Sequence, residues 1–276
     1  LKGDLHLIDE IEMVDQNPIG KSSRSNPVTY IKAYDSIRDL YARQALSKIR
    51  GFAAKHFSFN VDGGRCDVCQ GEGETVIEMQ FMADIKLECE ACGGHRYKKE
   101  VLEVEYNGKN IFEVLDLTVD EAMDFFADVK SVRERIKPLQ DVGLGYVKLG
   151  QGSNTLSGGE AQRVKLAFFL SKASPNKEGG TLFIFDEPTT GLDPQARHIL
   201  WDRLFRLKEK GVTLVITTHF MDEAEQLCER LIVIDRGKIM AEGSPADLIK
   251  KYSSKEVLEV RFGSENNEVV ADQLRD

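Results

Sequence analysis

Two adjacent carboxylates follow a short apolar run in the C-terminal third of the sequence. Residues 181–185 read Thr-Leu-Phe-Ile-Phe, and Asp186 and Glu187 come directly after them. A buried strand with this ending can present Asp186 to a Mg²⁺ ion and Glu187 to an attacking water, which is the division of labour that phosphoryl transfer requires. Acids at a strand end are also often solvated caps, so this interpretation depends on the residues around them.

Supporting residues stand on both sides of the carboxylate pair. Residues 156–160 read Leu-Ser-Gly-Gly-Glu, and two glycines without Cβ atoms let backbone N–H groups approach an anion at the start of a helix. This pattern predicts a site for the γ-phosphate of a nucleotide, although a glycine-rich helix start capped by Ser157 is the plainer alternative. After the pair come Asp193 in a Pro-Thr-Thr-Gly-Leu-Asp segment and His219 behind a second apolar run.

The order of these segments resembles the ATP-binding-cassette (ABC) ATPase family. The resemblance implies that Asp186 is the Walker B residue for Mg²⁺, that Glu187 is the catalytic base and that His219 is the switch histidine at the γ-phosphate. It also implies ATP as the cofactor and a nucleotide shared with a partner cassette. The further nucleotide-site candidates that it implies are Gln16 in the Q-loop, Ser157, Gly158, Gly159 and Glu160 in the signature loop, and Asp193 in the D-loop.

A phosphate-binding loop is missing from this order. No GxxxxGK[ST] segment occurs in the 276 residues. Gly20-Lys21-Ser22 imitates the end of one, but Asp15 stands five positions before Gly20, and prolines at positions 18 and 27 interrupt the segment. We therefore expect the Walker A loop to precede Leu1, and we expect the chain as given to bind ATP poorly or not at all.

Four of the five cysteines form two CxxC pairs. Cys66 and Cys69 are separated by nineteen residues from Cys89 and Cys92, a spacing within the range of structural Cys₄ zinc sites. Glycines follow each pair and permit the tight turns of a zinc knuckle. We therefore predict one Zn²⁺ ion bound by these four residues, with a redox CxxC pair as the alternative. The fifth, Cys228, is predicted to be a core residue.

The zinc module narrows the resemblance to the UvrA family of ATPases in nucleotide excision repair. In that family a zinc module lies in an insertion between Q-loop and signature loop, as it does here. The resemblance implies duplex DNA as a ligand, a homodimer formed through the ABC cassettes, and a UvrB-like repair partner. The segments that carry it are residues 15–20, 24–27, 57–60, 63–66, 141–146, 156–166 and 191–192, and they extend over roughly two-thirds of the chain.

The tail from about Asp193 resembles instead the ATPase subunits of drug-type ABC exporters. Residues 193–197, 219–224, 235–238 and 242–245 carry this second likeness. An exporter ATPase subunit is therefore the alternative function, although exporter cassettes have no zinc module. A non-enzymatic, zinc-bearing DNA-binding module is a third hypothesis, which the missing phosphate loop leaves open.

Basic residues gather ahead of the first cysteine pair. From position 40 to 65 there are five Lys or Arg residues and one acid, interleaved with four aromatic residues. This pattern predicts contact with DNA phosphates, and a solvated face is the alternative. The candidates are Arg43, Lys48, Arg50 and Lys55.

Composition indicates an ordinary soluble globular protein. Charged residues make up 30% and hydrophobic residues 41% of the sequence, and the net charge of −9 argues against a uniformly basic surface. No run of about 18 apolar residues predicts a membrane span, and no secretory signal is visible. We therefore expect a cytoplasmic protein without a membrane segment.

These observations predict an α/β protein with the P-loop NTPase-like core of an ABC ATPase, which lacks its Walker A segment and carries an inserted α+β signature domain. Parallel strands are expected at 181–185 and 213–217 around a helix at 194–210. A strand or hairpin is expected in 1–16, and helices at 30–46 and 118–126. The predicted domains are core residues 1–16, the signature domain 17–140 with the zinc module at 60–105, core residues 141–252, and a C-terminal extension 253–276.

Overall fold

A computed structural model describes residues 8–20, 22, 24–77, 85–172, 180–192, 194–209 and 211–252. The chain divides into two compact units, Leu1–His219 and Phe220–Asp276. The expected C-terminal extension and the D-loop candidate Asp193 lie outside the described residues. The other predicted domain boundaries remain predictions.

Three parallel strands form the sheet of the first unit. Their order is β1 (Ile8–Val14), β6 (Gly180–Asp186) and β7 (Thr213–Thr217), with β6 in the centre. Helix α9 (Pro194–Glu209) connects β6 to β7 and buries three leucines, so the predicted parallel α/β arrangement is confirmed. The register sets Val14 beside Phe185 and Asp186 beside Thr217. The carboxyl ends of all three strands therefore meet at one edge of the sheet.

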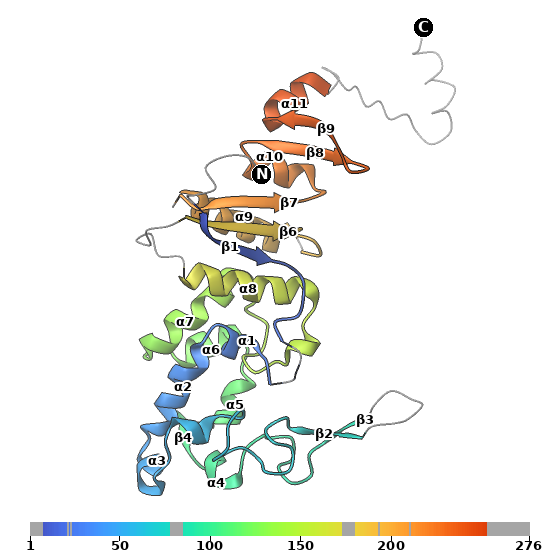
Figure 1. Ribbon diagram of the computed structural model, residues 1–276. Coiled ribbons are helices and arrows are strands. Elements are labelled where there is room, and N and C mark those ends of the chain that lie inside the picture. Colours follow the sequence, from blue (N-terminus) through green and yellow to red (C-terminus); the bar gives the residue numbers. More distant parts are fainter. Residues whose placement is uncertain are drawn as a thin grey trace, which may run out of the picture. The chain divides into compact units, whose positions relative to one another are not determined.

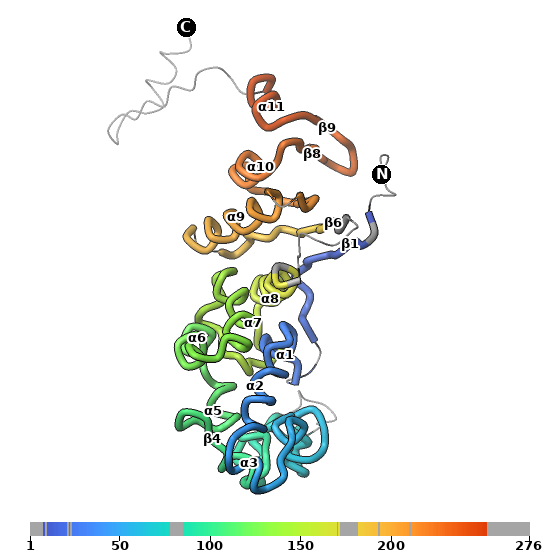
Figure 2. The backbone as a smooth tube through the Cα atoms, turned by 90° about the vertical axis from the view of Figure 1, so that its left-hand side faces the viewer, coloured from blue at the N-terminus to red at the C-terminus, as the bar shows by residue number. Residues whose placement is uncertain are grey.

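The signature helix α8 (Gly158–Lys172) lies between the sheet and the helices of the inserted region. It packs against β1 on one side and against α1 (Pro27–Tyr30) and α7 (Lys130–Asp141) on the other (Figures 1 and 2). Apolar residues are therefore buried on several of its faces, as expected for a helix enclosed on two sides. These buried residues are Ala161, Val164, Leu166 and Ala167.

The inserted region consists of short helices and two small hairpins. Its remaining helices are α2 (Ala33–Ala42), α3 (Ala45–Arg50), α4 (Lys99–Leu102), α5 (Ile111–Leu115) and α6 (Val119–Phe125), with 3₁₀ turns at Ala54–Phe57 and Ser153–Thr155. The hairpins pair β2 (Glu74–Ile77) with β3 (Ile85–Glu88), and β4 (Glu105–Tyr106) with β5 (Lys109–Asn110). Figure 1 shows β2 and β3 extending away from the helices.

Two helix predictions have different outcomes. The helix expected near 118–126 is α6, and a capping box between Thr118 and Glu121 begins it. The single helix expected at 30–46 is wrong, because the chain forms α1, α2 and α3 there. Lys32 adopts a left-handed conformation with φ 59°, and Gln44 is extended with ψ 151°. Neither conformation continues an α-helix.

Within residues 220–252, the described part of the second unit, the chain forms one antiparallel hairpin and two helices. The hairpin pairs β8 (Leu231–Asp235) with β9 (Lys238–Gly243). Helix α10 (Met221–Leu227) precedes it, and helix α11 (Pro245–Tyr252) follows it. Among the described residues of both units, no helix combines the length and the apolar character needed to cross a bilayer.

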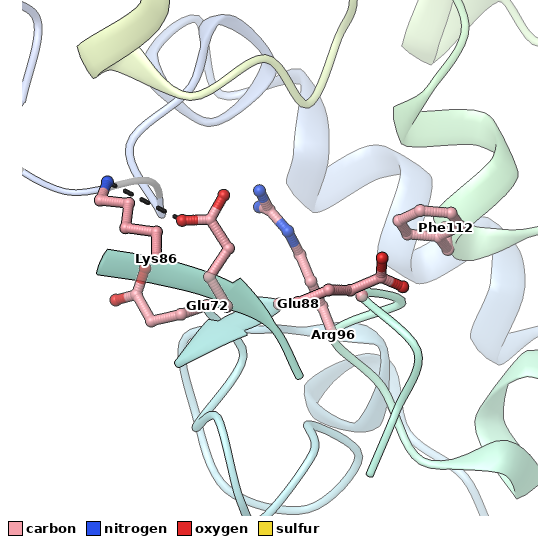
Figure 3. A pocket seen from close by; sticks show the side chains of 8 residues that line it. Glu72, Lys86, Glu88, Arg96 and Phe112 are labelled. Carbon is pink, nitrogen blue, oxygen red and sulfur yellow. Dashed lines mark ion pairs between the residues drawn. The ribbon is translucent and has the colours of Figure 1, made fainter. Parts of the chain in front are cut away.

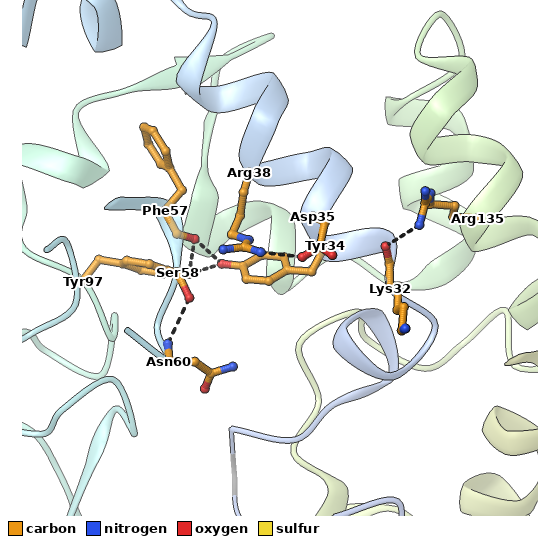
Figure 4. Close-up of polar contacts among 9 residues, drawn as sticks. All are labelled: Lys32, Tyr34, Asp35, Arg38, Phe57, Ser58, Asn60, Tyr97 and Arg135. Atoms are coloured by element: carbon orange, nitrogen blue, oxygen red, sulfur yellow. Dashed lines mark hydrogen bonds and ion pairs between the residues drawn. The ribbon is translucent and has the colours of Figure 1, made fainter. Parts of the chain in front are cut away.

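Two buried tyrosines join the helical part of the inserted region to its cysteine-bearing part. Tyr34 on α2 donates a hydrogen bond of 2.6 Å to the backbone carbonyl of Phe57, and its hydroxyl also contacts that of Tyr97 (Figure 4). The Tyr97 hydroxyl lies 3.3 Å from the same carbonyl. Burial raises the pKa of both hydroxyl groups, so both remain neutral hydrogen-bond donors.

We expect Tyr34→Phe to lower the free energy of unfolding by about 1–2 kcal/mol, because it removes the closer of the two donors to a buried carbonyl. Chemical denaturation followed by circular dichroism would measure the change. Tyr106→Phe is the matched control, since the Tyr106 ring packs on Phe126 and a phenylalanine retains that contact. A denaturation midpoint of Tyr34→Phe equal to that of the wild type would show that the Tyr34 hydroxyl contributes nothing to the free energy of unfolding.

Candidate nucleotide and metal sites

The predicted catalytic residues meet at the carboxyl ends of β6 and β7. Asp186 is the last residue of β6, and its Oδ1 accepts a hydrogen bond of 2.6 Å from the Thr217 hydroxyl. Glu187 follows, with Oε1 3.2 Å from Nδ1 of His219 and Oε2 accepting a 3.1 Å hydrogen bond from the Thr190 hydroxyl. The two adjacent carboxylates therefore have different partners, as two separate roles require.

Glu187 has an unusual backbone conformation. Its φ is 47°, in the left-handed region that residues with a Cβ atom seldom occupy. The neighbouring strand stabilises this conformation, because the Glu187 N–H donates to the Thr217 carbonyl at 3.0 Å. Strain of this kind persists only where the surroundings enforce it, and it often occurs at functional sites.

The signature loop begins α8 with a capping box. The N–H of Ser157 donates to Oε2 of Glu160 at 2.7 Å, and the N–H of Glu160 lies 3.3 Å from the Ser157 hydroxyl. The Tyr146 hydroxyl donates to Oε1 of Glu160 at 2.8 Å. Burial alone would raise the pKa of Glu160, but the hydrogen bonds from Ser157 and Tyr146 outweigh it and lower that pKa. Glu160 therefore stays ionised and stabilises the loop.

The Q-loop candidate lies beside the signature loop. A β-carbon built on Gly158 would lie 3.1 Å from Cβ of Gln16, which explains why glycine fits there. Asp15, one residue earlier, forms an ion pair with Lys165 of α8, and this hydrogen-bonded contact lowers the pKa of the Asp15 carboxyl. The structure thus brings the segment after β1 and helix α8 together.

Sequence reasoning gave no individual role to Tyr146, Gln162 or Lys165, although Gln162 belongs to the signature pattern. Gln162 is buried, with 2% of its surface exposed, and its side-chain amide donates to backbone carbonyls of both β1 and β6. The sequence contained a signal for Gln162 and Lys165, because these two polar residues lie one helical turn apart and therefore on the same face of a helix.

The four cysteines of the CxxC pairs form one cluster. Their sulfur atoms all lie within 4.8 Å of one another, with 3.9 Å between Cys66 and Cys89 and 3.7 Å between Cys69 and Cys92. These two opposite edges have the length expected in a tetrahedron whose centre lies about 2.3 Å from each vertex, the length of a zinc–thiolate bond. All four are free thiols. Their arrangement fits a single tetrahedral metal ion.

Glycines after the cysteine pairs shape the loops of this cluster. Gly71 has φ 85°, and a β-carbon there would lie 2.0 Å from the carbonyl oxygen of Phe59. The N–H of Gly73 donates to the sulfur of Cys69 at 3.3 Å. The turn glycines expected from the sequence are therefore required both by backbone conformation and by close approach.

Known proteins share this arrangement. A family model described as "AAA domain, putative AbiEii toxin, Type IV TA system" matches residues 112–220. The protein "UvrABC system protein A" of Aquifex aeolicus is 46% identical over 274 residues, which cover 93% of this chain and 29% of that protein. The crystal structure of UvrA2 from Deinococcus radiodurans matches with a TM-score of 0.83 and 45% identity, over 90% of this chain and 31% of that one. The chain belongs to the UvrA family.

The likeness to UvrA extends further than the sequence motifs indicated. An alignment over 93% of the chain must pass Asp193, where the exporter-like tail was expected to begin. A second relative, UvrABC system protein A of Clostridium perfringens, is 50% identical over 78% of this chain and 23% of its own length. The chain therefore spans under a third of the UvrA proteins that it matches.

The basic residues proposed to contact DNA are at the surface of this UvrA-type chain, but their aromatic neighbours are not. Arg43, Lys48, Arg50 and Lys55 are all exposed. Arg50 also forms an ion pair with Glu103 and donates to the Glu100 carbonyl at 2.7 Å. The aromatic residues interleaved with the basic candidates in the sequence belong to the core or its margin, so the predicted DNA contact rests on the basic residues alone. Tyr41, Phe57 and Phe59 are fully buried, and Phe52 is partly buried.

A cavity of about 290 Å³ lies beside the cysteine cluster, between the β2–β3 hairpin and Phe112 of α5 (Figure 3). Charged side chains of both signs line it, and Lys86 lies 3.8 Å from Glu74. Glu72 also forms a 2.7 Å ion pair with Arg24, which ties the cysteine-bearing loops to the segment before α1.

We expect purified protein to contain one metal ion per chain, with four sulfur neighbours at about 2.3 Å in X-ray absorption spectra. Cys89→Ser should abolish stoichiometric binding, because it removes a fully buried ligand. Cys228→Ser is the control and should bind metal normally, since Cys228 lies outside the cluster. Metal-free protein with a disulfide between Cys66 and Cys69 would contradict the metal site.

Proposed function

We propose that this chain is the signature, Walker B and metal-module part of a UvrA-type ATPase, acting in ATP-dependent recognition of DNA damage during nucleotide excision repair. The observation that carries the proposal is the meeting of Asp186, Glu187 and His219 at the ends of two parallel strands. The identity with UvrA proteins over nine-tenths of the chain favours this function over an exporter ATPase subunit.

The residues at the strand ends would divide the work of hydrolysis. Asp186, exposed at the end of β6, would hold Mg²⁺, which when bound offsets the charge of the nucleotide phosphates. Glu187 would accept the proton of the attacking water, with its carboxylate oriented by Thr190. His219 would face the γ-phosphate, because its Nδ1 already contacts Oε1 of Glu187. Asp193 and Gln16 keep their proposed D-loop and Q-loop roles.

A second copy of the cassette would complete the site. The side chain of Ser157 is exposed, and the following glycines leave backbone N–H groups accessible at the start of α8. Residues 157–160 would therefore close over a nucleotide bound by a partner cassette. This supports a homodimer through the ABC cassettes, in which the phosphate loop missing from the present sequence is supplied by the longer protein.

The metal in the cysteine cluster would be zinc. Four thiolates in a closed tetrahedron are typical of structural zinc sites, in which the ion contributes to folding and not to chemistry. The module would stabilise a DNA-binding surface for duplex DNA in the inserted region, with a UvrB-like protein as the repair partner. A cytoplasmic location agrees with these partners.

We expect duplex affinity to fall steeply with salt if the four basic candidates contact phosphates. Lys48→Glu and Lys55→Glu should each reduce the slope of log affinity against log salt concentration by about 1, because each removes one phosphate contact. Fluorescence anisotropy at several salt concentrations would measure this. Lys130→Glu, a fully exposed lysine on α7, is the matched control. An affinity unaffected by salt and by both reversals would leave a solvated face as the explanation.

We expect Glu187→Gln, in a protein that includes the phosphate loop, to bind ATP normally while kcat falls by about 10²–10⁴, the usual contribution of a general base. Steady-state hydrolysis and nucleotide binding would be measured together, with the surface variant Glu134→Gln as control. The 276-residue chain alone should hydrolyse almost no ATP. Full activity of Glu187→Gln would remove this residue from the mechanism, and rapid hydrolysis by the chain alone would contradict our view of its missing loop.

A further inference from the structure

One buried amide joins the signature helix to two of the three strands that end at the same edge of the sheet, β1 and β6. The Nε2 atom of Gln162 donates to the Val14 carbonyl at 2.9 Å and to the Asp186 carbonyl at 2.7 Å. Val14 is the last residue of β1, and Asp186 is the last residue of β6. Both hydrogens of the amide are therefore used to join two adjacent strand ends.

The orientation of this amide follows from its partners. Both neighbouring atoms are carbonyl oxygens, which only accept hydrogen bonds, so the nitrogen and not the oxygen must face them. The remaining oxygen, Oε1, is buried and has no hydrogen-bond partner among the described residues. A buried acceptor without a partner costs free energy. An apolar residue that only filled this space would not carry that cost.

Gln162 also stands in a specific place on α8. It lies two residues after Glu160, whose carboxylate caps the signature loop, and three residues before Lys165, which pairs with Asp15. Lys165 thus holds α8 to the segment after β1, whereas Gln162 holds α8 to β1 and β6 together. Because Gln162 is hydrogen-bonded to the Asp186 carbonyl, a displacement of the first turn of α8 would also displace that carbonyl.

We propose that Gln162 is a positioning residue that transmits the state of the signature loop to the backbone of Asp186 and Glu187. In the proposed ATPase, a nucleotide of the partner cassette that orders residues 157–160 would thereby set the position of this chain's own carboxylates. The strained backbone of Glu187 makes that position sensitive, because a small shift of Asp186 changes how firmly Thr217 holds the Glu187 N–H. The role of this coupling in ATP hydrolysis rests on the proposed function, whereas the structural coupling between the signature loop and Asp186 does not.

Amide hydrogen exchange of the 276-residue chain tests the coupling without any nucleotide. Ser157→Ala removes the cap of α8 and loosens the signature loop. The Glu187 amide reports on the end of β6, and the amides of residues 11–14 report on β1. We expect Ser157→Ala to speed exchange of the Glu187 amide about fivefold, the effect of losing one helix cap. In a Gln162→Met background the same change should alter that exchange by less than about twofold.

Lys165→Met is the matched control for a merely structural contact. It removes the polar contact of α8 with Asp15, the residue that follows β1, and leaves the contact of Gln162 with Asp186. It should therefore speed exchange in residues 11–14, while Ser157→Ala still acts on the Glu187 amide. Equal effects of Ser157→Ala with and without Gln162 would overturn the proposal, because independent sites are additive. If Gln162→Met does not fold, Gln162→Asn, whose shorter side chain cannot reach both carbonyls, replaces it under the same criterion.

The two proposals can fail separately. An additive exchange result would remove Gln162 as the coupling residue and would leave the role of Glu187 untouched. Absence of ATP hydrolysis in the complete cassette would remove the proposed function, while non-additive exchange would still show that Gln162 joins the signature loop to Asp186.

Discussion

The parallel pairing of β1 with β6 is the constraint on which the rest of the structure depends. It sets Val14 beside Phe185, although the entire inserted region lies between them in the sequence. The ends of the insertion must therefore return to neighbouring positions on the sheet. Helix α8 occupies that return path and packs against both β1 and the inserted helices. The proposed nucleotide site at the sheet edge and the cysteine cluster in the inserted region are consequently both attached to one short ladder of backbone hydrogen bonds.

Much of this arrangement could be predicted, because the sequence patterns that indicate it are local. The apolar run before Asp186 predicts β6, and the spacing of Cys66, Cys69, Cys89 and Cys92 predicts the cluster, since strands and tight turns depend on nearby residues. The broken helix at 30–46 could not be predicted. Its break at Lys32 needs a left-handed lysine, a conformation that sequence does not favour and that only packing can enforce.

Side-chain contacts between distant segments were also hidden from the sequence. The sequence did not show that Tyr41 and Phe57, which alternate with the basic DNA-contact candidates, are buried, because aromatic residues fit a core as well as a surface. Gln162 appeared only as part of a signature pattern, and its partners Val14 and Asp186 lie 148 and 24 residues away. Such contacts follow from the register of the sheet, which periodicity alone does not fix.

The left-handed backbone at Glu187 has a consequence for how this chain can change over time. A glycine at position 187 would adopt φ 47° without steric cost, so the folded state would tolerate it better than it tolerates glutamate. Selection for thermal robustness alone would favour that loss, whereas selection for the proposed ATPase activity would retain the carboxylate. In the proposed ATPase, position 187 is therefore one where stability and activity oppose each other, and engineering for a higher melting temperature alone would act against the proposed base.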